Sequence, residues 1–400
     1  MWLLPGIGPI NTKQRKCMQI ILISTSLPVN FPEKMQYRAI GLMSGSSLDG
    51  LDIVYAELDH SGGKWTYEIR AAACTTYPDE WLLQLQNVTS LSAYDYLLLH
   101  SAYGKYTGEK VNEFIEANGL QHKVQLVASH GHTVFHAPQL GMTAQLGDGA
   151  AIAAATGINT VSDLRTMDIA LGGQGAPIVP MGEKLLFKEY NYYVNLGGIA
   201  NITGTRPAYT AFDVCPANRV LNVLAAKENK PFDDGGAMAR TGTVNTALLT
   251  QLNSLDYYKQ PFPKSLANSF GTDIVLPLIA SFNLSAADAL RTYTEHIVQQ
   301  LLYAVNSLQA KNHGVQTAGK LLLTGGGAFN TFLTERLKEG LKVFDIEMII
   351  PGSDLIKYKE ALIMALLGVL RWREEDTVLH SVTGASRSSI GGAVWIGQEA

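Results

Sequence analysis

The stretch "AIGLMSGSSLDGLDIVYAELD", Ala39 to Asp59, consists of two apolar runs joined by small residues and carboxylates. The two runs predict neighbouring strands, but the loop between them, Ser44 to Gly50, is longer than a tight hairpin needs. Small residues leave backbone N–H groups accessible, and such groups can surround an anion, so the loop is a candidate phosphate site. An ordinary turn is the alternative, because serine, glycine and aspartate are common in turns.

Two carboxylates, Asp49 and Asp52, lie within or beside this loop. They would repel a bare phosphate, so phosphate binding here also requires a metal ion between the charges. A nucleotide bound together with magnesium is therefore the first hypothesis.

The composition is that of a globular protein with sizeable cores. The chain has 400 residues, of which 46% are hydrophobic and 16% charged, and this length favours two domains. The net charge of −4 has no long block of one sign, so we expect no nucleic-acid and no membrane partner. Three cysteines, Cys17, Cys74 and Cys215, form no C-x-x-C pair; they predict neither a disulfide framework nor a zinc site and fit a reducing cytoplasm.

The first 35 residues differ from the rest, with a basic "NTKQRKC" followed by an apolar "MQIILISTSLP". The apolar run is too short to span a bilayer, and an export signal is one interpretation. We favour the other, an extension upstream of a working start at Met35, because the run soon turns polar and no cleavage site is clearly placed after it.

Strands come first in hairpins and then alternate with helices, which predicts a mixed α/β sheet. In the first half we predict strands at residues 37–44, 51–58, 64–77, 125–131 and 159–165, and helices at 80–91, 94–118 and 148–157, the last capped by Asp148. The second half has a similar order: a glycine-rich strand at 192–203, a strand and a helix within 210–226 with Pro216 in the first turn of the helix, a long helix at 286–310, a strand at 320–330 and an apolar helix at 360–372.

Two similar α/β lobes around a cleft are the simplest interpretation of this order. We expect residues 1–35 to be an extension outside the core. The predicted first lobe is residues 36–160, with 380–400 as a candidate addition, and the predicted second lobe is residues 161–379.

Three glycine-rich segments, "MSGSSLDG", "NLGGIAN" and "LTGGGAFN", each follow an apolar strand. Because α/β sheets bind ligands in crevices at the carboxyl ends of strands, three such loops favour a ligand site. None has the dinucleotide-binding or P-loop pattern, so neither of those sites is predicted.

The segment "VSDLRTMDIALGGQGAPIVP" places Asp163, Arg165 and Asp168 ahead of a loop without bulky residues. A carboxylate at a strand end beside a cleft is a candidate general base, and Asp163 is in that position. The alternative is that Asp163 is a partner of Arg165 or a turn cap.

Three histidines lie close together in "SHGHTVFH". Strand side chains alternate, so His130 and His132 could share a face and resemble a metal site, with His136 nearby. No further ligand is evident, so we expect substrate contacts or structural hydrogen bonds, and no zinc.

Three further charged residues belong to no cluster of candidate ligands in the sequence. Glu360 begins the predicted apolar helix, where the helix dipole alone would explain a negative charge. Lys264 and Arg219 are single cations, and a solvated surface position is the commonest fate of such residues.

Residues Gly41 to Asp52, "GLMSGSSLDGLD", resemble the signature glycine-x-Met-Ser-Gly-Thr-Ser-x-Asp-Gly-x-Asp of the anhydro-N-acetylmuramic acid kinase family, with Ser46 where threonine is usual. The resemblance covers nearly everything after about residue 37, through "SHGHTVFH", "SDLRTMDIALGGQGAPIVP", "VNLGGIANIT", "FDDGGAMARTG", "LTGGGAFN", "KYKEALIMALLG" and "SVTGASRSS". Motifs of this length in the family's order are highly specific.

The resemblance implies the two-lobed, ribonuclease H-like fold of actin, hexokinase and the heat-shock chaperone ATPases, whose lobes clamp ATP and magnesium. It also implies a reaction of peptidoglycan recycling. Water opens the 1,6-anhydro bond of anhydro-N-acetylmuramic acid while the freed 6-oxygen takes the γ-phosphate, which gives N-acetylmuramic acid 6-phosphate. Phosphoryl transfer of this kind depends mainly on positioning and charge neutralisation.

The same resemblance assigns roles to individual residues. Asp163 matches the base that activates water, Asp49 would hold magnesium through water, and Glu360 lines the sugar site. The residues implied in phosphate and nucleotide binding are Ser44, Gly45, Ser46, Ser47, Leu48, Asp49, Gly50, Leu51, Asp52, Asn195, Gly197, Gly198, Asn201, Gly325, Gly326 and Gly327. Those implied in substrate binding are His130, His132, Thr133, Arg165, Asp168 and Glu360.

The chain departs from the family pattern at three places. Val214 to Asn218 replaces a glycine-proline-glycine-asparagine run, His132 stands where glutamine is usual, and Pro263 to Phe270 departs from proline-lysine-serine-threonine-glycine. In the resemblance these sites lie near the sugar, so they bear on substrate identity rather than on ATP binding.

We expect a kinase that uses ATP, Mg²⁺ and a small amino sugar. The alternatives are a kinase or ATPase of the same fold acting on another sugar, and a chaperone-like nucleotide switch, which would be expected to carry a separate peptide-binding domain. The sequence leaves the oligomeric state open, a homodimer included.

Overall fold

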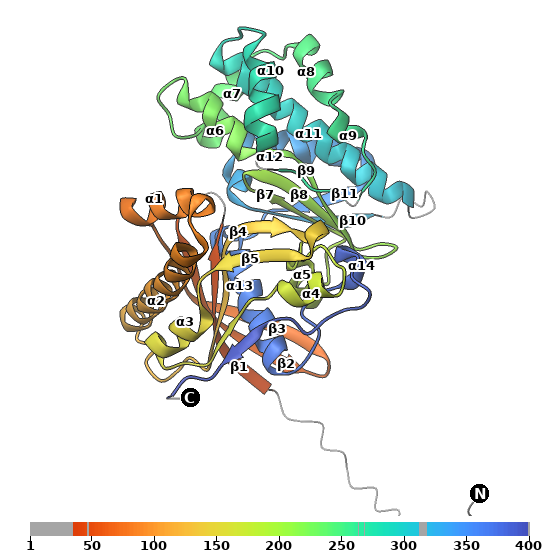
Figure 1. Ribbon diagram of the computed structural model, residues 1–400. Coiled ribbons are helices and arrows are strands. Elements are labelled where there is room, and N and C mark those ends of the chain that lie inside the picture. Colours follow the sequence, from red (N-terminus) through yellow and green to blue (C-terminus); the bar gives the residue numbers. More distant parts are fainter. Residues whose placement is uncertain (1–34, 46–47, 263, 268, 312–317, 399–400) are drawn as a thin grey trace, which may run out of the picture.

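The computed structural model describes residues 35–45, 48–262, 264–267, 269–311 and 318–398. Residues 1–34 of the expected N-terminal extension and two residues of the predicted phosphate loop, Ser46 and Ser47, lie outside the described residues. The described chain forms two lobes, each built on one sheet, with helix α13 (Ser353–Trp372) between them (Figure 1).

The first sheet has the strand order β12-β6-β4-β1-β2-β3, with β5 beside β4. Its strands are β1 (Met35–Ser44), β2 (Leu51–Ser61), β3 (Lys64–Thr75), β4 (Leu126–Ala137), β5 (Met142–Leu146), β6 (Thr160–Ser162) and β12 (Ala393–Trp395). Strands β1 and β2 are antiparallel, and Ser44 pairs with Leu51. The long loop of the opening stretch therefore joins two paired strands, as predicted.

The second sheet has the order β11-β10-β7-β8-β9. Its strands are β7 (Tyr192–Leu196), β8 (Ile199–Gly204), β9 (Thr210–Pro216), β10 (Gly319–Thr324) and β11 (Ile346–Ile349). The single strand predicted at 192–203 is wrong, because Gly197 and Gly198 form the turn of an antiparallel β7–β8 hairpin. Pro216 ends β9 rather than opening the following helix.

The two sheets have the same topology. In each, three consecutive strands form an antiparallel meander, β1-β2-β3 and β7-β8-β9, and two later strands continue the sheet in parallel on the other side of the first strand, β4-β6 and β10-β11. This repeated arrangement is that of the ribonuclease H-like lobes of actin- and hexokinase-like ATPases. The predicted fold class is confirmed.

The helices of the first lobe are α1 (Asp79–Asn87), α2 (Ala93–Ala117) and α3 (Gly149–Thr156). Asp148 caps α3, as predicted, because its Oδ1 accepts a hydrogen bond from Ala150 N. A Cβ at Gly108 of α2 would lie 2.6 Å from Ala155 Cβ, so the small residues of both helices permit close packing. The alanine-rich composition of α3 therefore serves its contact with α2.

Helix α13 packs across the first sheet and also reaches the second. A Cβ at Gly41 of β1 would lie only 1.9 Å from the carbonyl oxygen of Ala361, so glycine is required for this approach. The same buried cluster contains Tyr193 and Leu322 of the second sheet. Helix α13 starts at Ser353, seven residues before the predicted start at Glu360.

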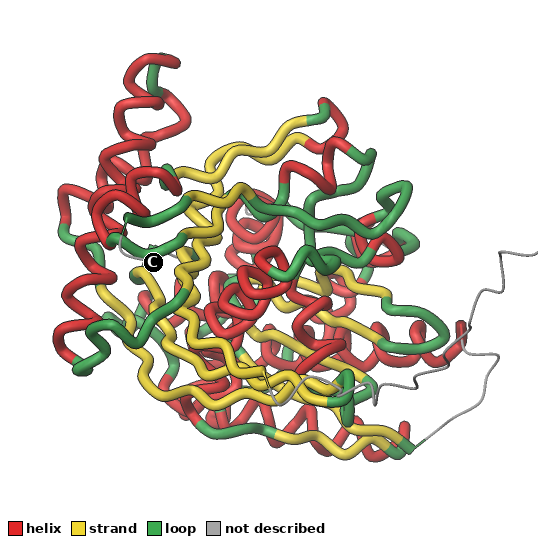
Figure 2. The backbone as a smooth tube through the Cα atoms, turned by 90° about the horizontal axis from the view of Figure 1, so that it is seen from below, coloured by secondary structure: helices red, strands yellow, loops and turns green. Residues whose placement is uncertain are grey.

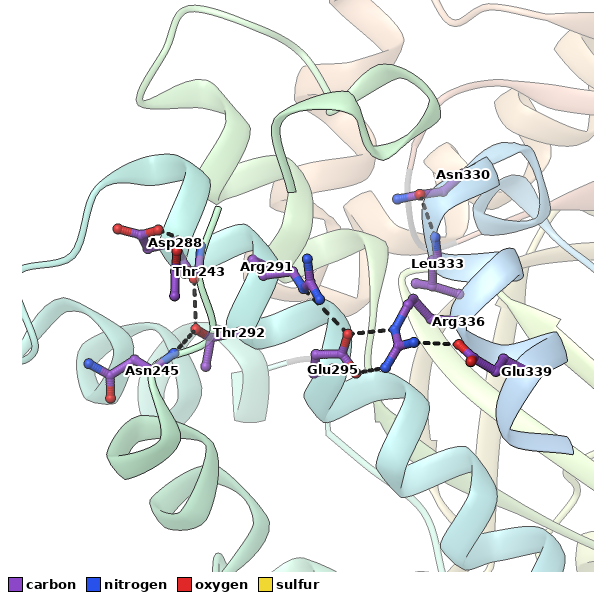
Figure 3. A network of polar contacts seen from close by, with 10 residues as sticks. All are labelled: Thr243, Asn245, Asp288, Arg291, Thr292, Glu295, Asn330, Leu333, Arg336 and Glu339. Atoms are coloured by element: carbon purple, nitrogen blue, oxygen red, sulfur yellow. Dashed lines mark hydrogen bonds and ion pairs between the residues drawn. The ribbon is translucent and has the colours of Figure 1, made fainter. Parts of the chain in front are cut away.

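The helices of the second lobe cover the far side of its sheet (Figure 1). They are α6 (Asn218–Ala226), α7 (Ala237–Thr241), α8 (Thr246–Asn253), α9 (Asp256–Lys259), α10 (Leu276–Ala280), α11 (Ala286–Lys311) and α12 (Thr331–Leu341). Figure 3 shows how α11 and α12 are joined: Arg336 Nε donates to Glu295 Oε1 at 2.8 Å, and Arg291 contacts the same carboxylate. Two cations thus compensate one buried carboxylate.

Three short helices lie in the connecting segments: α4 (Thr166–Ala170), α5 (Val179–Leu186) and α14 (His380–Thr383). Seen from below in Figure 2, the strands run through the middle of the molecule and most helices lie around them. The predicted lobe boundary between residues 160 and 161 falls within β6, a strand of the first sheet, and β12 joins that sheet from the C-terminal segment. None of the helices in the described part of the chain combines the length and apolar character that crossing a membrane requires.

Candidate active site

Glu360 of α13 lies where several predicted ligand segments meet. Asn195 Nδ2 at the end of β7 donates to Glu360 Oε1 at 3.1 Å. Burial raises the pKa of Glu360, whereas the nearby cations Lys359 and Arg165 lower it. The helix-dipole explanation of Glu360 is wrong, because the dipole acts within the first turn and this residue lies well inside the helix.

The second and third glycine-rich loops pack directly on each other. Gly325 has a φ of 82°, and a Cβ there would lie 2.4 Å from Asn195 Oδ1. A Cβ at Gly327 would lie 2.6 Å from Leu196 Cβ. Gly325 N also donates to the carbonyl of Ile356 on α13, at 3.2 Å. These two glycines are therefore explained by the packing of the protein alone.

Packing does not explain why three other positions are glycine, namely Gly197, Gly198 and Gly326. Their φ values are not positive, and the nearest atoms to an added Cβ lie at 3.4, 3.9 and 3.6 Å respectively, which are ordinary contact distances. Neither backbone conformation nor protein packing requires glycine at these positions. The open space beside them suits a ligand that approaches the backbone closely.

Replacing Gly326 by alanine tests this interpretation. We expect the melting temperature to stay within about 2 °C of wild type, while the affinity for ATP falls roughly tenfold because the methyl group occupies ligand space. The matched variant Gly327→Ala should instead lower stability, because its Cβ meets Leu196. Thermal unfolding and calorimetric titration with ATP measure both; unchanged ATP affinity in Gly326→Ala contradicts the assignment.

The start of the first loop is held by buried hydroxyls. Tyr77 donates to Ser44 Oγ at 2.8 Å, and the hydroxyls of Tyr77 and Tyr103 lie 2.5 Å apart. Ser44 Oγ also lies 2.9 Å from His132 Nδ1. Because two protein partners engage the Ser44 hydroxyl, a ligand would meet the backbone of this loop more readily than this side chain.

The carboxylates beside the first loop repel one another. Burial, then the carboxylates of Asp49 and Glu360, raise the pKa of Asp52 to about 6, against a hydrogen bond from the Cys74 thiol that lowers it. A hard cation would relieve this repulsion, so the donor chemistry fits magnesium. Among the described residues, no group of three potential His, Cys, Asp or Glu ligands could hold a metal ion.

Asp163 follows β6 with a φ of 54°, in the left-handed region. Its Oδ1 accepts hydrogen bonds from the hydroxyl of Thr166 at 2.5 Å and from Thr166 N at 3.4 Å. Its Oδ2 makes no hydrogen bond within the described part of the chain. Asp163 lines a cavity of 320 Å³, so one carboxylate oxygen is fixed by the turn and the other can act on a ligand.

Arg165 is not the partner of Asp163. Its Nε and Nη2 lie 3.0 and 2.8 Å from His130 Nε2, and its Nη1 donates to the carbonyl of Gly175 at 2.7 Å. His130 Nδ1 lies 2.7 Å from the carbonyl of Gly131, so His130 is the neutral tautomer that carries its proton on Nδ1. Burial and Arg165 lower the pKa of His130 to about 3.

The expected shared face of His130 and His132 is interrupted. Gly131 has a φ of 73°, and the register of β4 on β1 shifts between Leu42 and Ser44. His130 therefore faces Arg165 while His132 faces Ser44. The expectation that these histidines bind no zinc stays a prediction.

Some of the residues predicted to bind ligands make hydrogen bonds or packing contacts within the protein. Asp168 is buried, and its oxygens accept from Thr383 Oγ1 and Gly175 N, both at 2.7 Å. The side chain of Leu51 belongs to the core of the first lobe. Thr133 is exposed, and Asn201 pairs with Asn195 across the β7–β8 hairpin.

The surface interpretation of Lys264 is wrong. Its Nζ donates to the carbonyl of Tyr257 at 3.0 Å and lies 4.4 Å from the centre of that ring. Burial lowers the pKa of Lys264. Arg219 is likewise half-buried, and its side chain lies beside Gly198.

Two residues that line the cavity beside Asp163 could not be identified from the sequence. His100 of α2 and Gln145 of β5 both line the cavity beside Asp163. They come from segments far apart in the chain and belong to no quoted motif, so only the fold brings them to Asp163.

Comparison with known proteins adds independent findings. The model of the family described as anhydro-N-acetylmuramic acid kinase matches residues 37–397. A relative of that name from Hydrogenovibrio crunogenus is 32% identical and covers 92% of this chain and 99% of its own. One from Shewanella amazonensis is 34% identical, with 88% and 97% covered. A solved ROK family glucokinase from Streptomyces griseus, in complex with glucose and AMPPNP, is 11% identical, with a TM-score of 0.38 and 83% and 99% covered.

Proposed function

Because the chain belongs to the anhydro-N-acetylmuramic acid kinase family, we propose that it opens the 1,6-anhydro ring of anhydro-N-acetylmuramic acid and phosphorylates O6 at the expense of ATP. The observation that carries the proposal is the match over residues 37–397. The second and third glycine-rich loops also meet beside Glu360 of α13, and Asp163 lines a cavity of the first lobe. The product is N-acetylmuramic acid 6-phosphate, an intermediate of peptidoglycan recycling.

Asp163 is the residue that takes the proton of water. Thr166 holds Oδ1 of Asp163, and Asp163 lines the cavity, so the carboxylate is oriented before the substrate arrives. The water oxygen bonds to the anomeric carbon as Asp163 takes its proton, and the bond from that carbon to O6 breaks. O6 forms the new bond to the γ-phosphorus while the bond from that phosphorus to the β–γ bridging oxygen breaks, and ADP leaves. Enclosure between the two lobes limits hydrolysis of ATP by bulk water.

The nucleotide side is formed by residues of both lobes. The loop that follows Ser44 and the turn at Gly197 and Gly198 would bind the phosphates, and Gly326 would contact the nucleoside. Asp49, near Asp52, would hold a magnesium ion through water, and the ion would neutralise phosphate charge there.

Product analysis by mass spectrometry tests the proposal. After incubation with ATP, Mg²⁺ and the anhydro sugar, we expect a mass gain of one phosphoryl group plus one water. A gain of the phosphoryl group alone indicates a simple sugar kinase, and ADP release without a sugar product indicates an ATPase.

The magnesium role has its own test. We expect Asp49→Asn to weaken ATP binding measured with Mg²⁺ by about tenfold, while binding measured with EDTA stays the same, because only the metal-mediated contact is lost. Calorimetry provides both values. Equal Mg-ATP affinity in wild type and variant would remove Asp49 from the metal site.

The expected partners are ATP and the amino sugar. We propose a cytoplasmic location, where ATP is available and the scattered cysteines stay reduced. A homodimer is the oligomeric state to test, by light scattering of the purified chain.

A further inference from the structure

The start of α6 supports the hairpin turn at Gly197 and Gly198. Ala217 N donates to the carbonyl of Gly198 at 2.8 Å, and Asn218 N donates to the carbonyl of Gly197 at 3.1 Å. Arg219 N donates to the same carbonyl as Ala217 N, at 3.4 Å. These bonds fix the turn on α6 and place the Arg219 side chain beside it. Because the N–H groups already have partners, an anion beside this part of α6 would have to be bound by a side chain.

The guanidinium of Arg219 has no partner within the described part of the chain. Arg219 is half-buried, yet its side chain makes no hydrogen bond or ion pair with another described residue. Described arginines that do pair with carboxylates are Arg70, Arg240, Arg291, Arg336 and Arg373. A charge partly removed from water without a partner is unfavourable, whereas a guanidinium binds phosphate oxygens well, often through two N–H groups at once. The environment of Arg219 therefore suits an anionic ligand.

The Arg219 side chain borders the open space over Gly198. A Cβ added at Gly198 would lie 3.9 Å from both Cβ and Nε of Arg219, so the side chain passes this glycine at ordinary contact distance. A Cβ added at Gly326 would lie 3.6 Å from Nδ2 of Asn218, the residue before Arg219. Neighbouring residues of α6 therefore border the open space beside both glycines. A ligand that lies over Gly326 and Gly198 comes within reach of the guanidinium.

We propose that Arg219 binds the phosphates that remain with the nucleoside, in ATP and in ADP alike. The inference rests on the proposed function, in which Gly326 contacts the nucleoside and the turn at Gly198 binds phosphate. Arg219 belongs to the same lobe as these two loops, whereas Asp163 and its cavity belong to the first lobe. Since the γ-phosphate is transferred toward Asp163, a cation on α6 is placed for the other phosphates. Its charge also stabilises the negative charge that develops on the β-phosphate as the bond to the γ-phosphorus breaks.

Calorimetric titration of Arg219→Met with ADP, ATP and adenosine tests the assignment. We expect the affinities for ADP and ATP to fall about 10- to 100-fold, since a hydrogen bond between charged groups is lost, with the affinity for adenosine unchanged. Arg219→Lys keeps the charge but not the paired N–H groups, so it should lose less affinity. The melting temperature of the free protein should not fall in Arg219→Met, because the guanidinium has no partner in the described chain to lose.

Arg206→Met is the matched control, because it removes the same charge elsewhere in the same lobe. Arg206 is exposed and follows β8, whereas the turn at Gly198 precedes that strand. The control should leave all of these affinities unchanged. Unchanged ADP affinity in Arg219→Met would overturn the proposal, as would an equal loss for adenosine, a loss for ATP alone, or an equal loss in Arg206→Met. Because these titrations contain no sugar, a selective loss of ADP affinity in the variant, combined with a wild type that phosphorylates no sugar, refutes the proposed function and leaves the role of Arg219 intact.

Discussion

Replacing Asp163 by asparagine is expected to lower turnover by about 10²–10⁴, the scale of a positioned general base. Asparagine keeps the size of the side chain, tolerates the φ of 54°, and can still accept the hydrogen bonds from Thr166. It cannot take a proton from water. Steady-state turnover, thermal unfolding and ATP binding of the purified variant should therefore show a loss of turnover alone.

Asp148→Asn is the matched control. This aspartate lines the same cavity and also caps a turn, through the bond from Ala150 N to its Oδ1. Its turnover should stay within about threefold of wild type, because an asparagine cap is equivalent. Near-normal turnover in Asp163→Asn with a lowered melting temperature would reduce Asp163 to a turn cap. The ion pair with Arg165 is no longer an alternative, because Arg165 bonds to His130 and Gly175.

Replacing Lys359 by methionine is expected to destabilise the fold by about 3–5 kcal/mol. Its Nζ lies 2.8 Å from Glu183 Oε1, and both side chains are 3% exposed. The pair joins α13 to α5, and removing the cation leaves a buried carboxylate uncompensated. Urea unfolding followed by circular dichroism measures the loss.

Two comparisons separate this effect from a general loss of packing. The double variant Lys359→Met, Glu183→Leu should recover most of the stability, since neither charge is then buried alone. Lys105→Met, which removes an exposed pair with Glu109 at 3.9 Å, should cost no more than about 1 kcal/mol. If Lys359→Met costs no more than Lys105→Met, the buried pair is not important for stability.

Most local elements, and the candidate ligand loops, could be predicted from the amino-acid sequence alone. Alternating and apolar runs give the strands, Asp148 caps its helix, and the long loop after β1 joins paired strands, because these features depend on neighbours in the chain. The motif order identified the family, and the repetition of strand and glycine-rich loop predicted two similar lobes. The predictions for the hairpin at Gly197 and for the start of α13 were wrong. Glycine within an apolar run, and a polar first turn before one, make the ends of an element difficult to recognise in the sequence.

The contacts between side chains distant in the chain became evident only from the packing of the folded protein. Arg165 is two residues from Asp163 in the chain, yet it bonds to His130, which β4 supplies from 35 positions away. The three glycine-rich loops looked alike, but packing explains Gly325 and Gly327, whereas Gly326 faces open space. His100 and Gln145 lie in the same cavity as Asp163. Strand β5, which carries Gln145, pairs with β4, and the turn after β5 bonds to His100 of α2 through Gly147 N. Such contacts depend on how whole elements pack against one another, and this packing cannot be inferred from which residues are neighbours in the chain.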